Sequence, residues 1–194
     1  MRKIIGITGG TATGKTTVSK YIKSLGYQVY DCDEIAHSVF MKSDIQEKLQ
    51  QAFNIKCSVK REDIAEIVFQ DKNKMAILNT IMRPAILKEM EDIIKNSAHT
   101  IFFDTPLLYD WHLGAMFDKV VFVYAGKDMQ IKRLIARDSI DIAYATDKLN
   151  AQLPIDKKLE IAIVRGDIII DNNSDEKSLY KKVDAILKEL SYDI

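Results

Sequence analysis

The sequence lacks the features that mark disulfide-rich, zinc-binding and DNA-binding proteins. Its 194 residues include two cysteines, Cys32 and Cys57, and three histidines, His37, His99 and His112. The cysteines form no CxxC pair and no metal-ligand spacing with the histidines, so we expect reduced thiols and no metal held by these residues. Basic and acidic residues both number 28, and no basic block occurs, so duplex nucleic acid is not an expected partner.

Long hydrophobic runs are also missing. No apolar stretch approaches the roughly 20 residues that a membrane-spanning helix needs. The apolar part of residues 1–6 is too short for a signal peptide. We therefore expect a cytoplasmic protein without membrane contact, as a monomer or a weak homo-oligomer.

The hydrophobic pattern predicts one α/β domain over residues 1–194. Apolar residues make up 47% and charged residues 29%, as in ordinary globular proteins. Strands are expected at about 3–8, 27–31, 100–105, 119–124 and 167–171. Helical patterns alternate with them, which predicts a doubly wound, five-stranded, mostly parallel sheet of the P-loop NTPase type.

Helical periodicity marks several of the connecting segments. Helices are expected from residue 15 to about 25, with Gly26 at the end, over 127–138, and after Ser174, which can serve as an N-cap. The segment 35–98 is too long for a plain crossover, so we interpret it as an inserted substrate-binding subdomain. Pro84 suits the first turn of a new helix within it.

A phosphate-binding motif lies directly after the first predicted strand. The residues that fit G-x-x-x-x-G-K-[ST] and its flank are Gly9, Gly10, Thr11, Ala12, Thr13, Gly14, Lys15, Thr16 and Thr17. Glycines let backbone N–H groups surround an anion, and the following helix adds its unpaired N–H groups. Lys15 is expected to reach the β- and γ-phosphates of ATP, and the Thr16 hydroxyl to ligate Mg²⁺. The alternative is a glycine-rich turn without a ligand.

Acidic residues follow two of the predicted strands. If the chain stays extended, Asp31 and Asp33 point to the same side, where a carboxylate could accept the proton of an attacking hydroxyl or orient Mg²⁺. Alternatively, they are solvated acids that open the next helix. Asp104 ends a buried strand and is a second Mg²⁺ candidate, or else a capping aspartate. The pattern leaves the choice between Asp31 and Asp104 open.

Two arginines lie one turn apart on the helix expected at 127–138. Arg133 and Arg137 share a face, and the planar guanidinium can pair two phosphate oxygens at once. With the polar segment that follows, which carries Lys148, they predict a lid over ATP at about 128–158. The alternative is a surface helix in which Arg137 pairs with a nearby acid.

Five stretches of the chain are shared with a known family. They are Ile7–Gly10 with Gly14–Thr17, Asp31–Ala36, Asp104–Tyr109, Lys132–Asp138 and Asp167–Asn173. Through them the chain resembles bacterial dephospho-CoA kinases over nearly its whole length. The resemblance implies transfer of the ATP γ-phosphoryl group to the ribose 3′-hydroxyl of dephospho-CoA, with Mg²⁺ bound to ATP.

The resemblance also implies roles for residues. Asp33 falls at the position of the family's catalytic base, and Lys15, Arg133 and Arg137 join it in the catalytic set. Asn172 joins the phosphate-loop residues in binding the nucleotide. The helical insertion falls where the family binds the pantetheine and adenosine parts of the acceptor.

Four positions depart from the family pattern. Ala12 stands where glycine is usual, Arg83 where histidine is common before the proline, Asp110 in place of a glutamate and Lys148 in place of an arginine. Lysine cannot reproduce a bidentate contact, so the lid role of Lys148 is in doubt.

Three other functions remain open. Another small-metabolite or nucleoside monophosphate kinase would share this fold. A GTP-dependent switch is disfavoured because N-K-x-D and D-x-x-G are missing. An inactive relative is disfavoured because Lys15, Thr16 and Asp33 are all present.

Overall fold

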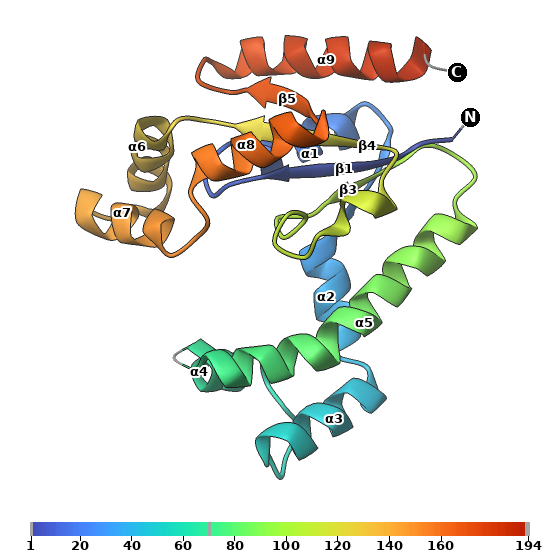
Figure 1. The fold of residues 1–194 in the computed structure, drawn as a ribbon, viewed down its shortest axis with the longest axis vertical. Helices are drawn as coiled ribbons and strands as arrows, with labels where there is room; N and C mark the ends of the chain where they lie inside the picture. Colours follow the sequence, from blue (N-terminus) through green and yellow to red (C-terminus); the bar gives the residue numbers. More distant parts are fainter. Residues whose placement is uncertain (1, 70, 193–194) are drawn as a thin grey trace. The chain divides into compact units, whose positions relative to one another are not determined.

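The computed structural model describes residues 2–69 and 71–192 (Figure 1). The chain divides into two compact units, one formed by residues 1–30 and 98–194 and the other by residues 31–97. The first contains the sheet, and the second is helical.

The first unit is built on a five-stranded sheet with the order β2-β3-β1-β4-β5. The strands are β1 (Ile4–Gly9), β2 (Gln28–Asp31), β3 (Ile101–Asp104), β4 (Lys119–Tyr124) and β5 (Ile168–Asp171). β1 pairs in parallel with β3 and β4, and β4 pairs in parallel with β5. The predicted doubly wound sheet is confirmed, with strand ends within one residue of those expected.

Side chains alternate between the two faces of the sheet. Ile5 and Ile7 of β1 point into a core built with α1 (Lys15–Ser24) and α9 (Glu176–Tyr192), and Figure 1 shows α9 alongside β5. On the other face, Phe103 lies against Phe117, with ring centroids 6.0 Å apart. Helix α8 (Ile155–Arg165) also contacts β4 and β5. The sheet is thus buried on both faces, as its apolar strands require.

Local signals fix most helix ends in this unit. α1 begins after Gly14 and ends before Gly26, both with positive φ, and α6 (Lys127–Asp138) has the predicted bounds. The prediction that Ser174 caps the last helix is wrong. Asp175 takes that position, since its carboxylate accepts the Ser178 N–H at 2.8 Å and α9 begins one residue later.

The second unit consists of α2 (Cys32–Phe40), α3 (Ser43–Phe53), α4 (Arg61–Phe69) and α5 (Lys72–Asn96). The first three helices pack on α5. This unit begins at Asp31, whereas we expected the helical insertion to begin at about residue 35.

The prediction that Pro84 starts a new helix is wrong. It lies inside α5, which runs for 25 residues. An interior proline costs about 3 kcal/mol because it removes one hydrogen bond and crowds the preceding turn. The buried stripe Met82, Ile86 and Met90 continues past it, so packing keeps the helix whole. Within residues 2–69 and 71–192, no helix, α5 included, has the length and hydrophobicity to cross a membrane.

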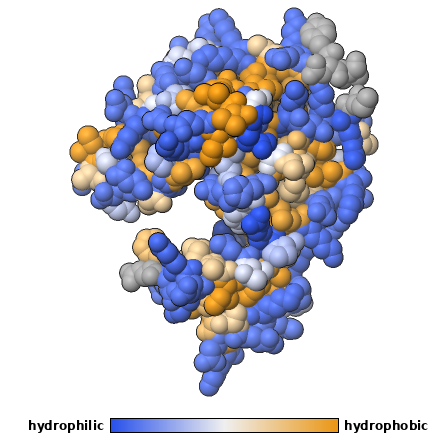
Figure 2. Space-filling view, in the orientation of Figure 1, coloured by the Kyte–Doolittle hydropathy of each residue, from blue (hydrophilic) through white to orange (hydrophobic). Residues whose placement is uncertain are grey.

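Figure 2 shows hydrophobic surface over α8. Ile155, Lys158 and Ala162 are buried on the inner side of this helix, whereas Ile163 and Val164 near its end are 61% and 87% exposed. Helix α8 therefore departs in two respects from the usual distribution of polar and apolar residues. A lysine is buried on its inner side, and two apolar residues are exposed near its end.

Phe102 belongs to the core between the sheet, α1 and α9, with 1% of its surface exposed. We expect Phe102→Ala to lower the free energy of unfolding by about 3–5 kcal/mol, because it removes apolar contacts and leaves a cavity. Urea denaturation followed by circular dichroism would measure this. Phe69→Ala is the matched control, since Phe69 is 85% exposed, and it should change stability by less than about 0.5 kcal/mol.

Candidate active site

The phosphate loop joins the carboxyl end of β1 to α1. The Thr13 N–H and hydroxyl both donate to the Gly10 carbonyl, at 3.3 and 2.9 Å, and close the loop into a tight turn. Gly14 has a φ of 95°, and a Cβ built there would lie 2.2 Å from Asn172 Nδ2. Both backbone conformation and space therefore require glycine at position 14.

Groups outside the loop hold its carbonyl oxygens. Asn172, directly after β5, donates its side-chain amide to Thr13 O at 2.8 Å. Gln130 of α6 donates to Thr11 O at 2.6 Å. With these carbonyls bound by side chains from outside the loop, its N–H groups other than that of Thr13 can serve an anion. Asn172, which the resemblance assigns to nucleotide binding, thus lies against the loop, and so does Gln130, which was not predicted.

Arg133 binds the same backbone from α6. Its Nη1 lies 3.4 Å from Ala12 O and 3.3 Å from Thr13 O, and its Nη2 donates to Asn172 O at 2.9 Å. Burial lowers the pKa of the Arg133 guanidinium from its ordinary value. Within residues 2–69 and 71–192 its hydrogen-bond partners are all carbonyl oxygens, so a positive charge stands beside the loop without a carboxylate from this part of the chain to balance it.

Lys15 and Asp104 form an ion pair at the centre of the site. Lys15 lies in the first turn of α1 and Asp104 at the end of β3, where Asp104 pairs in register with Ile7 of β1. Ser19, one turn further along α1, donates to the second Asp104 oxygen at 2.7 Å. Asp104 is 5% exposed, so its carboxylate is buried and oriented from both sides. It is neither the cap nor the turn residue of our alternative.

Thr16 and Thr17 occupy the first turn of α1. Thr16 is exposed and Thr17 is half-buried. In the described part of the chain, no group of three or more His, Cys, Asp or Glu could hold a metal ion by itself. Mg²⁺ commonly takes one or two protein oxygens and completes its shell with phosphates and water. The Thr16 hydroxyl and the Asp104 carboxylate are oxygen donors of that kind.

The chain does not stay extended at Asp31 and Asp33, and the alternative holds, in which these acids open the next helix. α2 begins at Cys32, and the Asp31 carboxylate accepts the Asp33 N–H at 2.8 Å. An aspartate is a strong N-cap, so the chain turns into a helix here. Asp33 is an exposed carboxylate in the first turn of α2, where the positive end of the helix dipole stabilises its charge.

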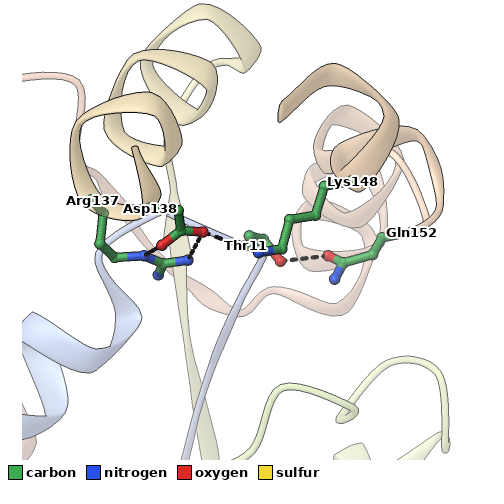
Figure 3. A network of polar contacts seen from close by, with 5 residues as sticks. All are labelled: Thr11, Arg137, Asp138, Lys148 and Gln152. Carbon is green, nitrogen blue, oxygen red and sulfur yellow. Dashed lines mark hydrogen bonds and ion pairs between the residues drawn. The ribbon is translucent and has the colours of Figure 1, made fainter. Parts of the chain in front are cut away.

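Arg137 does not contact the phosphate loop (Figure 3). Its Nε and Nη2 both donate to Asp138, at 2.6 and 3.0 Å, and Lys148 of α7 (Ile142–Asn150) reaches the same carboxylate at 3.0 Å. The donors Arg137 and Lys148 hold the pKa of Asp138 well below its usual range, and the Asp138 hydrogen bond raises the pKa of Arg137. This is the alternative we considered, in which Arg137 pairs with a nearby acid.

Asp138 and Gln152 were not predicted as site residues. Thr11 of the phosphate loop donates its hydroxyl to the Gln152 side chain at 2.9 Å, and Figure 3 shows both beside Lys148. The only sequence signal for Asp138 was its position next to Arg137. Nothing in the spacing of Gln152 indicated this contact.

A family model described as dephospho-CoA kinase matches residues 3–178. A dephospho-CoA kinase of Fusobacterium nucleatum is 35% identical over 195 residues, which cover 96% of this chain and 98% of the relative. One of Streptococcus pyogenes is 34% identical over 197 residues, covering 97% and 98%. The chain belongs to the dephospho-CoA kinase family.

Solved structures agree on the fold of this family. A Thermus thermophilus protein superposes with a TM-score of 0.81 at 26% identity, covering 97% of this chain and 98% of its own. A dephospho-CoA kinase from Campylobacter jejuni gives 0.69 at 24% identity, covering 100% and 99%. A shikimate kinase from Bacteroides thetaiotaomicron gives 0.52 at 16% identity, covering 97% and 98%, which shows that a second small-molecule kinase shares the fold.

The tyrosine of the P-L-L-Y stretch that resembles dephospho-CoA kinases is structural. The Tyr109 hydroxyl donates to Asp167 at 2.9 Å, and Arg165 donates to the same oxygen at 3.1 Å. Burial, followed by the Asp167 hydrogen bond, raises the pKa of Tyr109. The tyrosine therefore stays neutral and ties the loop after β3 to the start of β5. Its neighbour Asp110, which replaces the usual glutamate, lies 3.5 Å from the buried Lys158.

Ala12 departs from the family pattern with a measurable consequence. Its φ is 58°, in the left-handed region that glycine adopts more easily. We expect Ala12→Gly to raise the free energy of unfolding by about 0.5–1 kcal/mol, because the relief of left-handed strain exceeds the added entropy of the unfolded chain. Urea denaturation in a buffer without MgATP would measure this change in the free energy of unfolding.

Ala136→Gly is the matched control for this prediction. Ala136 is exposed in the last turn of α6, where glycine should instead cost up to about 1 kcal/mol. Destabilisation by both substitutions would contradict the strain assigned to Ala12.

Proposed function

We propose that the chain transfers the γ-phosphoryl group of ATP to the ribose 3′-hydroxyl of dephospho-CoA and so yields coenzyme A. The observation that carries this proposal is the phosphate loop with Lys15 at its end, in a chain whose family match spans residues 3–178. A phosphoryl transfer of this kind needs little covalent chemistry from the protein. It needs a fixed triphosphate and a positioned hydroxyl.

The loop Gly9–Thr17 would bind the triphosphate through its inward N–H groups, and Asn172 and Arg133 would hold that loop in shape. Lys15 would leave Asp104 for the β- and γ-phosphates, since phosphate offers it a second anionic partner at the same place. Support for this comes from the uncompensated charge of Arg133 and from the start of α1 at the loop.

Mg²⁺ would be held by Thr16 and by the Asp104 carboxylate released from Lys15. Asp104 is favoured over Asp31 because the Asp31 carboxylate already caps α2. When bound with ATP, the ion would neutralise charge that develops on the phosphate oxygens. Ser19 would keep Asp104 oriented throughout.

Asp33 would accept the proton of the acceptor hydroxyl or hold that hydroxyl in line with the γ-phosphorus. Support for this role is the position of Asp33 in the first turn of α2, where the residue is exposed. For a loose transition state, position matters more than base strength, so an ordinary carboxylate suffices. The helical unit 31–97 would supply the acceptor contacts, and residues 128–158 with Arg137 would close over ATP.

The direct test is to incubate the pure protein with MgATP and dephospho-CoA and to identify coenzyme A by its mass. Parallel reactions with AMP, CMP and gluconate distinguish the proposal from the other small-metabolite kinases. Preferential phosphorylation of one of these three would overturn the acceptor assignment.

Lys15→Ala should slow turnover by a factor on the order of 10²–10³, as expected for the loss of a preorganised charge at the transferring group. Steady-state kinetics at saturating ATP would measure it. Lys181→Ala, which removes an exposed lysine of α9, is the control and should be close to wild type. Equal turnover of Lys15→Ala and wild type would refute the role of Lys15.

Asp33→Asn should reduce turnover strongly and leave ATP affinity mostly unchanged, because the carboxylate acts on the acceptor rather than on the nucleotide. Rapid-quench measurement of coenzyme A formation, together with calorimetric titration of ATP, would separate the two. Glu34→Gln removes the neighbouring charge from the same first turn of α2 and serves as control. If both variants lose the same activity, the effect belongs to the helix terminus and not to Asp33.

A further inference from the structure

Asp138 collects two cations from two helices beside the phosphate loop (Figure 3). Arg137, on the same last turn of α6, binds it through Nε and Nη2, and Lys148 in the last turn of α7 binds it through Nζ. We call the pair of bonds from Arg137 Nε and Nη2 to Asp138 the fork. Adjacent residues on a helix do not normally face each other, so this fork exists only because α6 ends here. Ser139 follows in the left-handed conformation, with a φ of 52°.

The fork leaves most of the Arg137 guanidinium unused. Arginine has five N–H donors, and two of them point at Asp138. The remaining donors are two on Nη1 and one on Nη2, and the two bonds already made fix the direction of the plane that holds them. The three side chains together also carry one excess positive charge, since one carboxylate faces two cations.

The cluster lies next to the phosphate loop. Gln152, four residues after Lys148, accepts the Thr11 hydroxyl at 2.9 Å, and Gln130 on α6 binds the Thr11 carbonyl at 2.6 Å. Thr11 is therefore held between the helix that carries Arg137 and the turn that follows Lys148. The excess positive charge of the cluster is therefore close enough to attract an anion that is bound to the loop.

Stability does not explain the cluster. The Arg137 and Lys148 side chains are 60% and 43% exposed, and ion pairs this exposed contribute little to folding. Asp138 thus adds little to the stability of the fold, but it fixes two cations beside the phosphate loop. The position that it gives Arg137 and Lys148 explains the cluster better than stability does.

We propose that Asp138 is a positioning residue that holds Arg137 and Lys148 together as one clamp for the phosphates of ATP. The inference rests on the proposed function, because it assigns the anion on the loop to ATP. Lys148 contributes a single point contact, and Arg137 contributes the oriented edge of its guanidinium.

Calorimetric titration of the full-length protein with the MgATP analogue AMP-PNP tests this without any acceptor. Asp138→Asn removes an acid near the nucleotide, so charge alone would tighten binding. The positioning role predicts the opposite, a loss of affinity of about tenfold, because two side chains lose their orientation. Glu160→Gln, which removes an exposed carboxylate paired with Lys157 on α8, is the matched control and should bind within twofold of wild type.

Steady-state kinetics on the same variants measure KM for ATP and KM for the acceptor separately. A residue with a merely structural role would not change one and leave the other. Asp138→Asn should raise KM for ATP and leave KM for the acceptor unchanged, with Tm within about 2 °C of wild type. Asp138→Glu should recover most of the ATP affinity, since it restores the carboxylate. Unchanged or tighter AMP-PNP binding by Asp138→Asn would overturn the proposal. Because the titration needs no acceptor, this outcome stays readable even if dephospho-CoA proves not to be the substrate.

Discussion

The site depends on how the phosphate loop is held from outside. A loop that surrounds an anion must point its N–H groups inward, so its carbonyls must find partners elsewhere. Asn172 and Gln130 donate to the carbonyls of Thr13 and Thr11, and Arg133 donates to those of Ala12 and Thr13. These three side chains come from the end of β5 and from α6. The sheet order, in which β4 lies beside β1 and β5 beside β4, is what brings them to the loop.

The balance of charge follows from the same arrangement. Lys15 and Arg133 stand at the loop, and Arg137 and Lys148 stand beside it. Two carboxylates, Asp104 and Asp138, face these four cations and leave two positive charges in excess. The chain as a whole has no net charge, so this local excess is a property of the site and not of the surface at large. Such local potentials attract polyanions at short range and are screened beyond it.

The sequence was sufficient where a signal is local or strictly periodic. The strands, the phosphate loop and the bounds of α6 follow from apolar runs, glycines and helical spacing. Predictions failed where two local signals compete or where packing decides. Asp31 is both a strand end and a helix cap, and the cap prevailed; Pro84 is a helix breaker, but the buried stripe through Met82 and Ile86 overrides it. The Asp138 fork depends on how α6 ends against α7, which no spacing reveals.

The replacement of an arginine by Lys148 becomes intelligible in this light. A lysine is a poor substitute wherever a planar, two-pronged contact is required. Here Asp138 already receives its two-pronged contact from Arg137, and it takes only one further donor from α7. The single ammonium group of Lys148 is sufficient for this contact, because it has to reach only one Asp138 oxygen, at 3.0 Å. The departure therefore falls at the one place in the cluster where a forked side chain is not needed.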